Sequence, residues 1–178
     1  VDELRFYSAS LLLIVNYIQT KNVIHRDIKP NNIMIDKNGY IKLIDFGTAK
    51  IVDDYTSTVI GTPQYTAPEV MKGKGYSMSC DYWTIGVIAY EIFYGKIPFG
   101  NNSGNDIVAI YNSILHDQPQ FSTNVNYKSI DDFIRMLLEK KVNKRICSFN
   151  LLRKAKIFEF DRESDLRSST GTYMNKDY

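Results

Sequence analysis

Three short strings of residues, in a fixed order, constrain this chain more than any other feature. Residues 25–32 read HRDIKPNN, residues 45–47 read DFG and residues 67–69 read APE. Between the first two strings, two short apolar runs flank Asn38 and Gly39, a dipeptide that favours a tight β-hairpin turn. The hairpin would hold Asp27 and Asp45 near each other, although they are far apart in the sequence.

The residue types in these strings suit phosphoryl transfer, a reaction in which a protein mainly positions the reactants and neutralises charge. Asp27 can accept the proton of an attacking hydroxyl group, and Lys29 can reach the transferring phosphate as a point charge. Asn32 and Asp45 offer the hard oxygen ligands that suit Mg²⁺. Each string alone also occurs as an ordinary turn or solvated loop, so the interpretation depends on all three occurring together.

Composition and charge exclude several other classes of protein. With 178 residues, 44% of them apolar, the chain is long enough for one domain with a hydrophobic core. Its formal charge of +2 is nearly balanced, so we expect neither a nucleic-acid nor a membrane-surface partner. The apolar run at residues 11–15 is too short for a membrane segment. Cys80 and Cys147 indicate free, buried thiols in a reducing compartment, the cytoplasm.

Hydrophobic periodicity predicts a mainly helical fold with short β-hairpins. We expect helices at residues 4–20, 79–94, 106–116, 128–140 and 148–155, and strands at 33–35 and 40–44. The helices at 4–20 and 79–94 are apolar on nearly every face, so both are expected to be buried. Residues 48–66 are polar and typical of a loop. We expect one domain at residues 1–160 and a polar tail at 161–178.

The strings resemble those of eukaryotic serine/threonine protein kinases, over about residues 4–160. The similarity is to the C-terminal lobe of the α+β kinase fold. Lys29 and the run GTPQY at 61–65 follow the serine/threonine rather than the tyrosine pattern. The fuller runs DFGTAK at 45–50 and GTPQYTAPE at 61–69 resemble the basophilic, cyclic-nucleotide-dependent branch, most of all cGMP-dependent kinases.

The resemblance implies ATP and Mg²⁺ as cofactors and Ser or Thr hydroxyls of proteins as acceptors. It implies that Asp27 is the catalytic base and that Lys29 binds the transferring phosphate. Asn32 and Asp45 would bind the metal ion and, through it, the nucleotide. Met34 would line the adenine pocket.

Further residues match positions that support or regulate the family's active site. Thr62 would hydrogen-bond both Asp27 and Lys29. The structural positions would be an apolar contact between His25 and Phe46, a buried ion pair between Glu69 and Arg145, and an anchor for backbone amides at Asp81.

Two groups of residues match the family's regulatory and substrate positions. Thr58 would be the activating phosphorylation site, with Arg26 and Lys50 as its phosphate ligands. The substrate pocket would include Val59, Pro63, Thr66 and Glu91. Thr48 follows the DFG string directly, and its β-branched side chain favours threonine acceptors.

The chain also departs from the family pattern. No glycine-rich loop, strand lysine or partner glutamate precedes residue 25, so we expect the N-terminal lobe to lie outside this chain. The 178-residue chain alone is therefore expected to be inactive. Asn31 stands where basophilic relatives usually carry a glutamate that reads a substrate arginine, which leaves Glu91 alone of that pair.

Three functions remain open. The chain can be a piece of a complete kinase, with cyclic-nucleotide-binding domains upstream as a further possibility. It can instead be a stand-alone lobe that docks substrates or another kinase without catalysis. A third alternative is nucleotide sensing without phosphoryl transfer. The first is favoured because Asp27, Lys29, Asn32 and Asp45 all fit distinct chemical roles.

Overall fold

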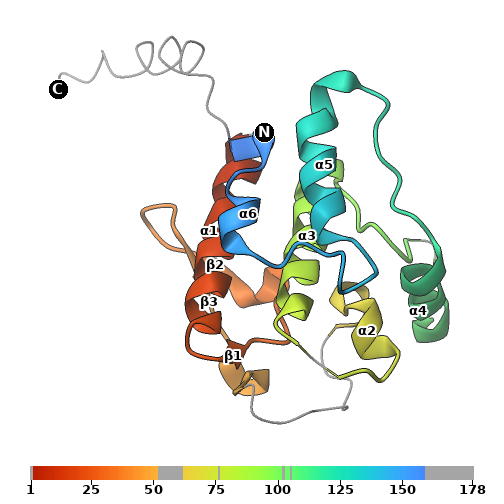
Figure 1. The fold of residues 1–178 in the computed structure, drawn as a ribbon, viewed down its shortest axis with the longest axis horizontal. Coiled ribbons are helices and arrows are strands. Elements are labelled where there is room, and N and C mark those ends of the chain that lie inside the picture. The colour runs from red at the N-terminus through yellow and green to blue at the C-terminus, as the bar shows by residue number, and fades with distance from the viewer. Residues whose placement is uncertain (1, 52–61, 76, 102, 105, 159–178) are drawn as a thin grey trace.

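The structure, a computed structural model, describes residues 2–51, 62–75, 77–101, 103–104 and 106–158. Within these residues the fold is mainly helical, with two small two-stranded sheets (Figure 1). The predicted fold class is therefore confirmed. The tail expected at 161–178 lies outside the described residues.

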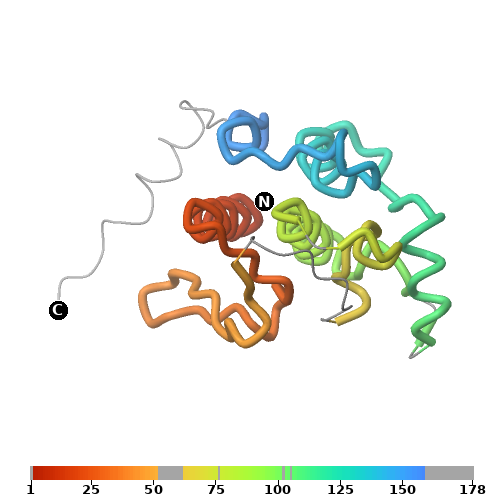
Figure 2. Tube along the Cα trace, turned by 60° about the horizontal axis from the view of Figure 1, so that its bottom comes forward, coloured from red at the N-terminus to blue at the C-terminus, as the bar shows by residue number. Residues whose placement is uncertain are grey.

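Helix α3 (Ser79–Tyr94) is the buried centre of the fold. Every residue from Ser79 to Tyr90 is buried, which confirms the sequence prediction. Only its last turn reaches the surface, where Ile92 is exposed. Figure 2 shows α3 with helix α1 (Asp2–Gln19) beside it and the remaining helices above and to one side.

Helix α1 is buried on one side only, so the prediction that it is buried all round is wrong. Leu11, Leu12 and Val15 belong to the core, whereas Leu13 and Tyr17 are exposed. The reason is its place in the fold: α1 packs against α3, the sheets and α6 (Phe149–Leu152), and these neighbours leave its outer side open (Figure 2).

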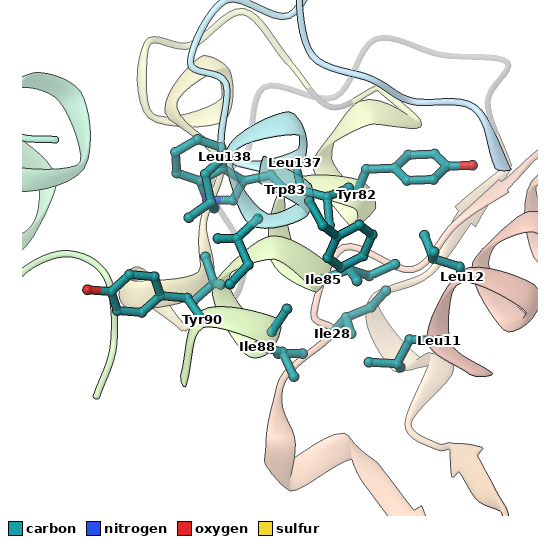
Figure 3. Packing of buried hydrophobic residues seen from close by; sticks show 14 of the residues in the cluster. Leu11, Leu12, Ile28, Tyr82, Trp83, Ile85, Ile88, Tyr90, Leu137 and Leu138 are labelled. Atoms are coloured by element: carbon teal, nitrogen blue, oxygen red, sulfur yellow. The ribbon is translucent and has the colours of Figure 1, made fainter. Parts of the chain in front are cut away.

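Helix α5 (Lys128–Leu137) crosses α3 at Gly86. A Cβ atom at Gly86 would lie 2.7 Å from the Leu137 Cβ atom, so a larger residue there would push the two helices apart. Figure 3 shows Leu137 and Leu138 beside Trp83 of α3 in the shared core.

Helices α4 (Ile107–His116) and α6 (Phe149–Leu152) lie close to those predicted, and a 3-10 turn at Lys156–Phe158 follows α6. The short helix α2 (Pro68–Met71) was not predicted. Helix α5 ends at Leu137 rather than at residue 140, and the Met136 oxygen accepts from the Ile146 N–H instead of from a further helical turn. Beyond the helix, the Glu139 oxygen accepts from Arg145 Nε. No helix of the described residues is long and apolar enough to cross a membrane.

Strands β2 (Ile33–Ile35) and β3 (Ile41–Leu43) form the predicted hairpin. The Asp36 carboxylate accepts from the N–H groups of Asn38 and Tyr40, and Gly39 has a φ of 86°, which favours glycine. The pairing of β1 (Val23–Ile24) with β4 (Lys50–Ile51) was not predicted, because two-residue strands carry no periodicity.

Candidate active site

The hairpin brings Asn32 and Asp45 to the same end of its two strands. In the antiparallel register Ile33 pairs with Leu43, and the Ile44 N–H continues the ladder by donating to the Asn32 oxygen at 2.9 Å. Asp45 therefore follows directly after the residue opposite Asn32. The two proposed metal ligands sit at the open end of one short hairpin.

Asp27 is held by two side chains of its own loop. Lys29 Nζ lies 2.8 Å from Asp27 Oδ2. The Asn32 Nδ2 group donates to the backbone oxygen of Asp27 at 2.8 Å and to Oδ2 at 3.2 Å. These contacts fix the direction of the Asp27 carboxylate, as a general base requires.

The donor groups next to Asp27 fit a magnesium ion. Because Asn32 uses its NH₂ group on Asp27, its Oδ1 atom faces away and accepts no hydrogen bond within the described residues. Asp45 is exposed, and its carboxylate accepts from the Gly47 N–H at 3.2 Å. The described residues contain no group of three His, Cys, Asp or Glu that could hold an ion. A set of few protein oxygens suits Mg²⁺, which retains water and binds phosphate oxygens as well.

Asp81 holds the backbone of the loop that carries Asp27 through hydrogen bonds to its amides. It is buried at the start of α3, and its two carboxylate oxygens accept from the N–H groups of His25 at 3.0 Å and Arg26 at 3.1 Å. Burial raises the pKa of Asp81 to about 6, although these hydrogen bonds favour its charged form. Arg26 has a φ of 70°, a strained value that the paired amides help to hold.

His25 connects the loop to the DFG segment. Its ring lies 4.8 Å from the Phe46 ring at an angle of 67°, and its Nε2 atom lies 3.2 Å from the Ile44 oxygen. Burial lowers the pKa of His25. The side chain is therefore held as a neutral ring with Nε2–H donating to Ile44.

The second segment of the site begins at Thr62. Lys29 Nζ donates to Thr62 Oγ1 at 3.2 Å, so Lys29 contacts both Asp27 and this segment. Thr66 is buried, and its hydroxyl donates to the Thr62 oxygen at 3.2 Å, whereas Pro63 is half-buried. Contact of Pro63 and Thr66 with a substrate stays a prediction.

The other predicted positions lie in three places. Met34 is 53% exposed on β2, opposite Lys42, where the resemblance puts the adenine ring. Lys50 pairs with Ile24, two residues before Arg26, so both predicted phosphate ligands lie at one end of the β1–β4 sheet. Thr58 and Val59 lie outside the described residues.

Glu91 has a partner that sequence reasoning missed. Its Oε2 atom accepts from the Tyr65 hydroxyl at 2.8 Å. No signal in the sequence pairs these two residues. Glu91 remains half-buried, so the carboxylate predicted to read a basic substrate residue is already shared with a protein donor.

Comparison with known proteins gives consistent matches. Residues 1–156 match the family model described as protein kinase domain. A cGMP-dependent protein kinase of Plasmodium berghei is 40% identical over 165 residues, which make up 92% of this chain and 19% of that protein. The cGMP-dependent protein kinase of Toxoplasma gondii is 41% identical over 150 residues, 84% of this chain and 15% of that protein.

A cAMP-dependent kinase also matches. The type 3 cAMP-dependent protein kinase of Saccharomyces cerevisiae is 39% identical over 142 residues, 80% of this chain and 35% of that protein. The chain thus spans less than a fifth of the length of the two cGMP-dependent relatives and about a third of the yeast relative.

Proposed function

Because this chain belongs to the protein kinase family, we propose that it supplies the catalytic and metal-binding residues of an enzyme that transfers the γ-phosphate of ATP to Ser or Thr hydroxyls of proteins. It is homologous to cyclic-nucleotide-dependent Ser/Thr kinases over most of its length. Its free cysteines favour a reducing, cytoplasmic location.

The observation that carries the proposal is the arrangement around Asp27. Its carboxylate contacts Lys29 and Asn32, and Asn32 lies opposite Ile44, the residue before Asp45, across the hairpin. A base, a cation for phosphate oxygens and two oxygen ligands therefore occupy one small region. A docking surface would not require these four residue types to meet in this way.

Each residue has a separate task in the proposed reaction. Asp27 orients the acceptor hydroxyl and takes its proton, while Lys29 offers positive charge to the transferring phosphate. The bound Mg²⁺ would neutralise charge on the nucleotide phosphates. Asn32 and Asp45 would hold that ion beside the base.

We also propose that the chain works as part of a longer kinase. The small share of its relatives that it spans supports this idea. Because catalysis depends mainly on positioning, the 178-residue chain alone is expected to show negligible phosphoryl transfer and weak MgATP binding. Efficient phosphorylation of a peptide by the purified chain would contradict this.

The test uses two substitutions in the complete protein that carries this chain. Asp27→Asn should lower turnover by about 10²- to 10⁴-fold, with ATP affinity little changed. Asp45→Asn should weaken Mg²⁺-dependent nucleotide binding as well as turnover. Asp132→Asn, on the exposed side of α5, is the matched control and should behave like wild type.

Peptide phosphorylation and fluorescent-nucleotide binding would be measured on all variants. The same kinetic pattern for Asp27→Asn and Asp45→Asn would contradict the separate roles. Absence of phosphoryl transfer by the wild-type protein, together with tight peptide binding, would favour the docking alternative.

A further inference from the structure

Thr48 makes two hydrogen bonds to the segment that leads into Asp27. Its hydroxyl donates to the backbone oxygen of His25 at 3.0 Å. In return, its own backbone oxygen accepts from Arg26 Nε. Thr48 lies three residues after Asp45, and His25 lies two residues before Asp27. The two bonds therefore connect the segments that carry the two carboxylates.

The need for a side-chain donor follows from the backbone. The pairing of β1 with β4 ends at Ile24 and Lys50. Arg26, with its positive φ, then turns the chain away from the ladder. At His25, the residue after Ile24, the backbone oxygen accepts a hydrogen bond from the Thr48 hydroxyl rather than from a backbone amide of the other strand. The hydroxyl thus extends the contact of the two segments beyond the sheet.

We propose that Thr48 is a positioning residue, whose hydroxyl fixes the Asp45 segment against the Asp27 loop and thereby sets the Mg²⁺ concentration that turnover requires. The metal part of this inference rests on the proposed function. Thr48 touches neither carboxylate, so it acts through the backbone of residues 45–49.

Three features separate this role from general packing. Valine has nearly the shape of threonine but cannot donate, so Thr48→Val would leave the His25 oxygen without this donor in a fully buried residue. Serine keeps the donor. The Phe46 ring already packs against His25, so loss of one hydroxyl should loosen the segment without unfolding it.

The first measurement needs no activity. In amide hydrogen exchange of the complete protein, Thr48→Val should speed exchange of the Ala49 N–H, which bonds to the Phe46 oxygen, by about three- to tenfold, as expected for loss of one hydrogen bond. Thr48→Ser should exchange like wild type. Thr20→Val, which removes a hydroxyl that bonds only near the end of α1, is the control.

The second measurement is a Mg²⁺ titration of peptide phosphorylation. Thr48→Val should need about three- to tenfold more Mg²⁺ for half-maximal turnover, with the KM for the peptide unchanged, and Thr48→Ser should restore the wild-type value. Unchanged exchange in Thr48→Val, or a Thr48→Ser variant as altered as Thr48→Val, would overturn the inference. A change in peptide KM alone would overturn it too. If the wild type transferred no phosphate, the proposed function would be wrong, whereas the exchange data would still decide whether the hydroxyl holds the segment.

Discussion

Glu69 and Arg145 face each other through two nearly parallel hydrogen bonds. Arg145 Nη1 lies 2.6 Å from Glu69 Oε1, and Arg145 Nη2 lies 2.8 Å from Glu69 Oε2. Both side chains are almost fully buried. Burial alone would raise the pKa of Glu69, but the hydrogen bonds and charge of Arg145 leave that pKa lowered. The pair therefore joins α2 to the segment after α5 as two charged groups.

Arg145→Met should destabilise the protein by about 3–5 kcal/mol, because it leaves the Glu69 charge buried without its partner. Adding Glu69→Gln should cost less than the sum of the two single changes, since the uncompensated charge is then gone. Arg153→Met, at an exposed arginine, is the control. Urea unfolding of the four variants would test this, and strictly additive losses would contradict the coupling.

His25 should make stability depend on pH between about pH 7.5 and 5.5. Its pKa is lowered in the folded state, mainly by burial, so the unfolded chain takes up a proton first as the pH falls. The contribution of His25 to the free energy of unfolding should therefore decrease as the pH falls through the unfolded value of 6.5, whereas the raised pKa of Asp81 contributes with the opposite sign in all variants. In His25→Gln this part of the decrease should be absent.

His116 provides the control, because it is the second of only two histidines and is exposed. His116→Gln should keep the pH dependence of the wild type. Urea unfolding at the two pH values would be compared for all three proteins. An equal pH dependence in wild type and His25→Gln would contradict the assignment to His25.

Asn31→Glu should increase the preference for peptides with an arginine before the phosphoacceptor. In the wild type, Glu91 is the single carboxylate assigned to this task, and Tyr65 already donates to it. A second carboxylate, at the exposed position 31, should favour the Arg peptide over its Ala counterpart by a factor of about 2–5, in line with an exposed ion pair. Asn112→Glu, an equal charge change on α4, should leave the ratio of kcat/KM values unchanged. A similar rise in both variants would point to net charge instead.

Thr58→Ala and Arg26→Ala should each lower the activity of the complete kinase. Thr58 lies outside the described residues, so its role stays a prediction. A phosphate there would add a charge of about −1.5 to −2, which a guanidinium can pair through two hydrogen bonds. If the two residues act together, the double variant should be little worse than either single one. Fully additive losses, or a fully active Thr58→Ala, would remove this switch.

The sequence by itself determined the local elements. Asn38 and Gly39 predicted the hairpin that connects the Asp27 loop to Asp45, whereas its register came from the structure. Helix α3 was predictable as the buried centre, because its apolar residues occur on every face through residue 90. The ion pair of Glu69 with Arg145 and the amide anchor at Asp81 came from family resemblance rather than from any pattern in the residues.

Only the tertiary structure decided which side of α1 is exposed to solvent. It also decided two hydrogen bonds, from the Tyr65 hydroxyl to the Glu91 carboxylate and from the Thr48 hydroxyl to the His25 backbone oxygen. Periodicity reports contacts between residues a few positions apart, since it reflects the geometry of one helix or strand. These three features depend instead on how separate elements pack against one another. The two residues of each hydrogen bond lie 23 or more positions apart in the sequence, and no local pattern encodes a contact over such a separation.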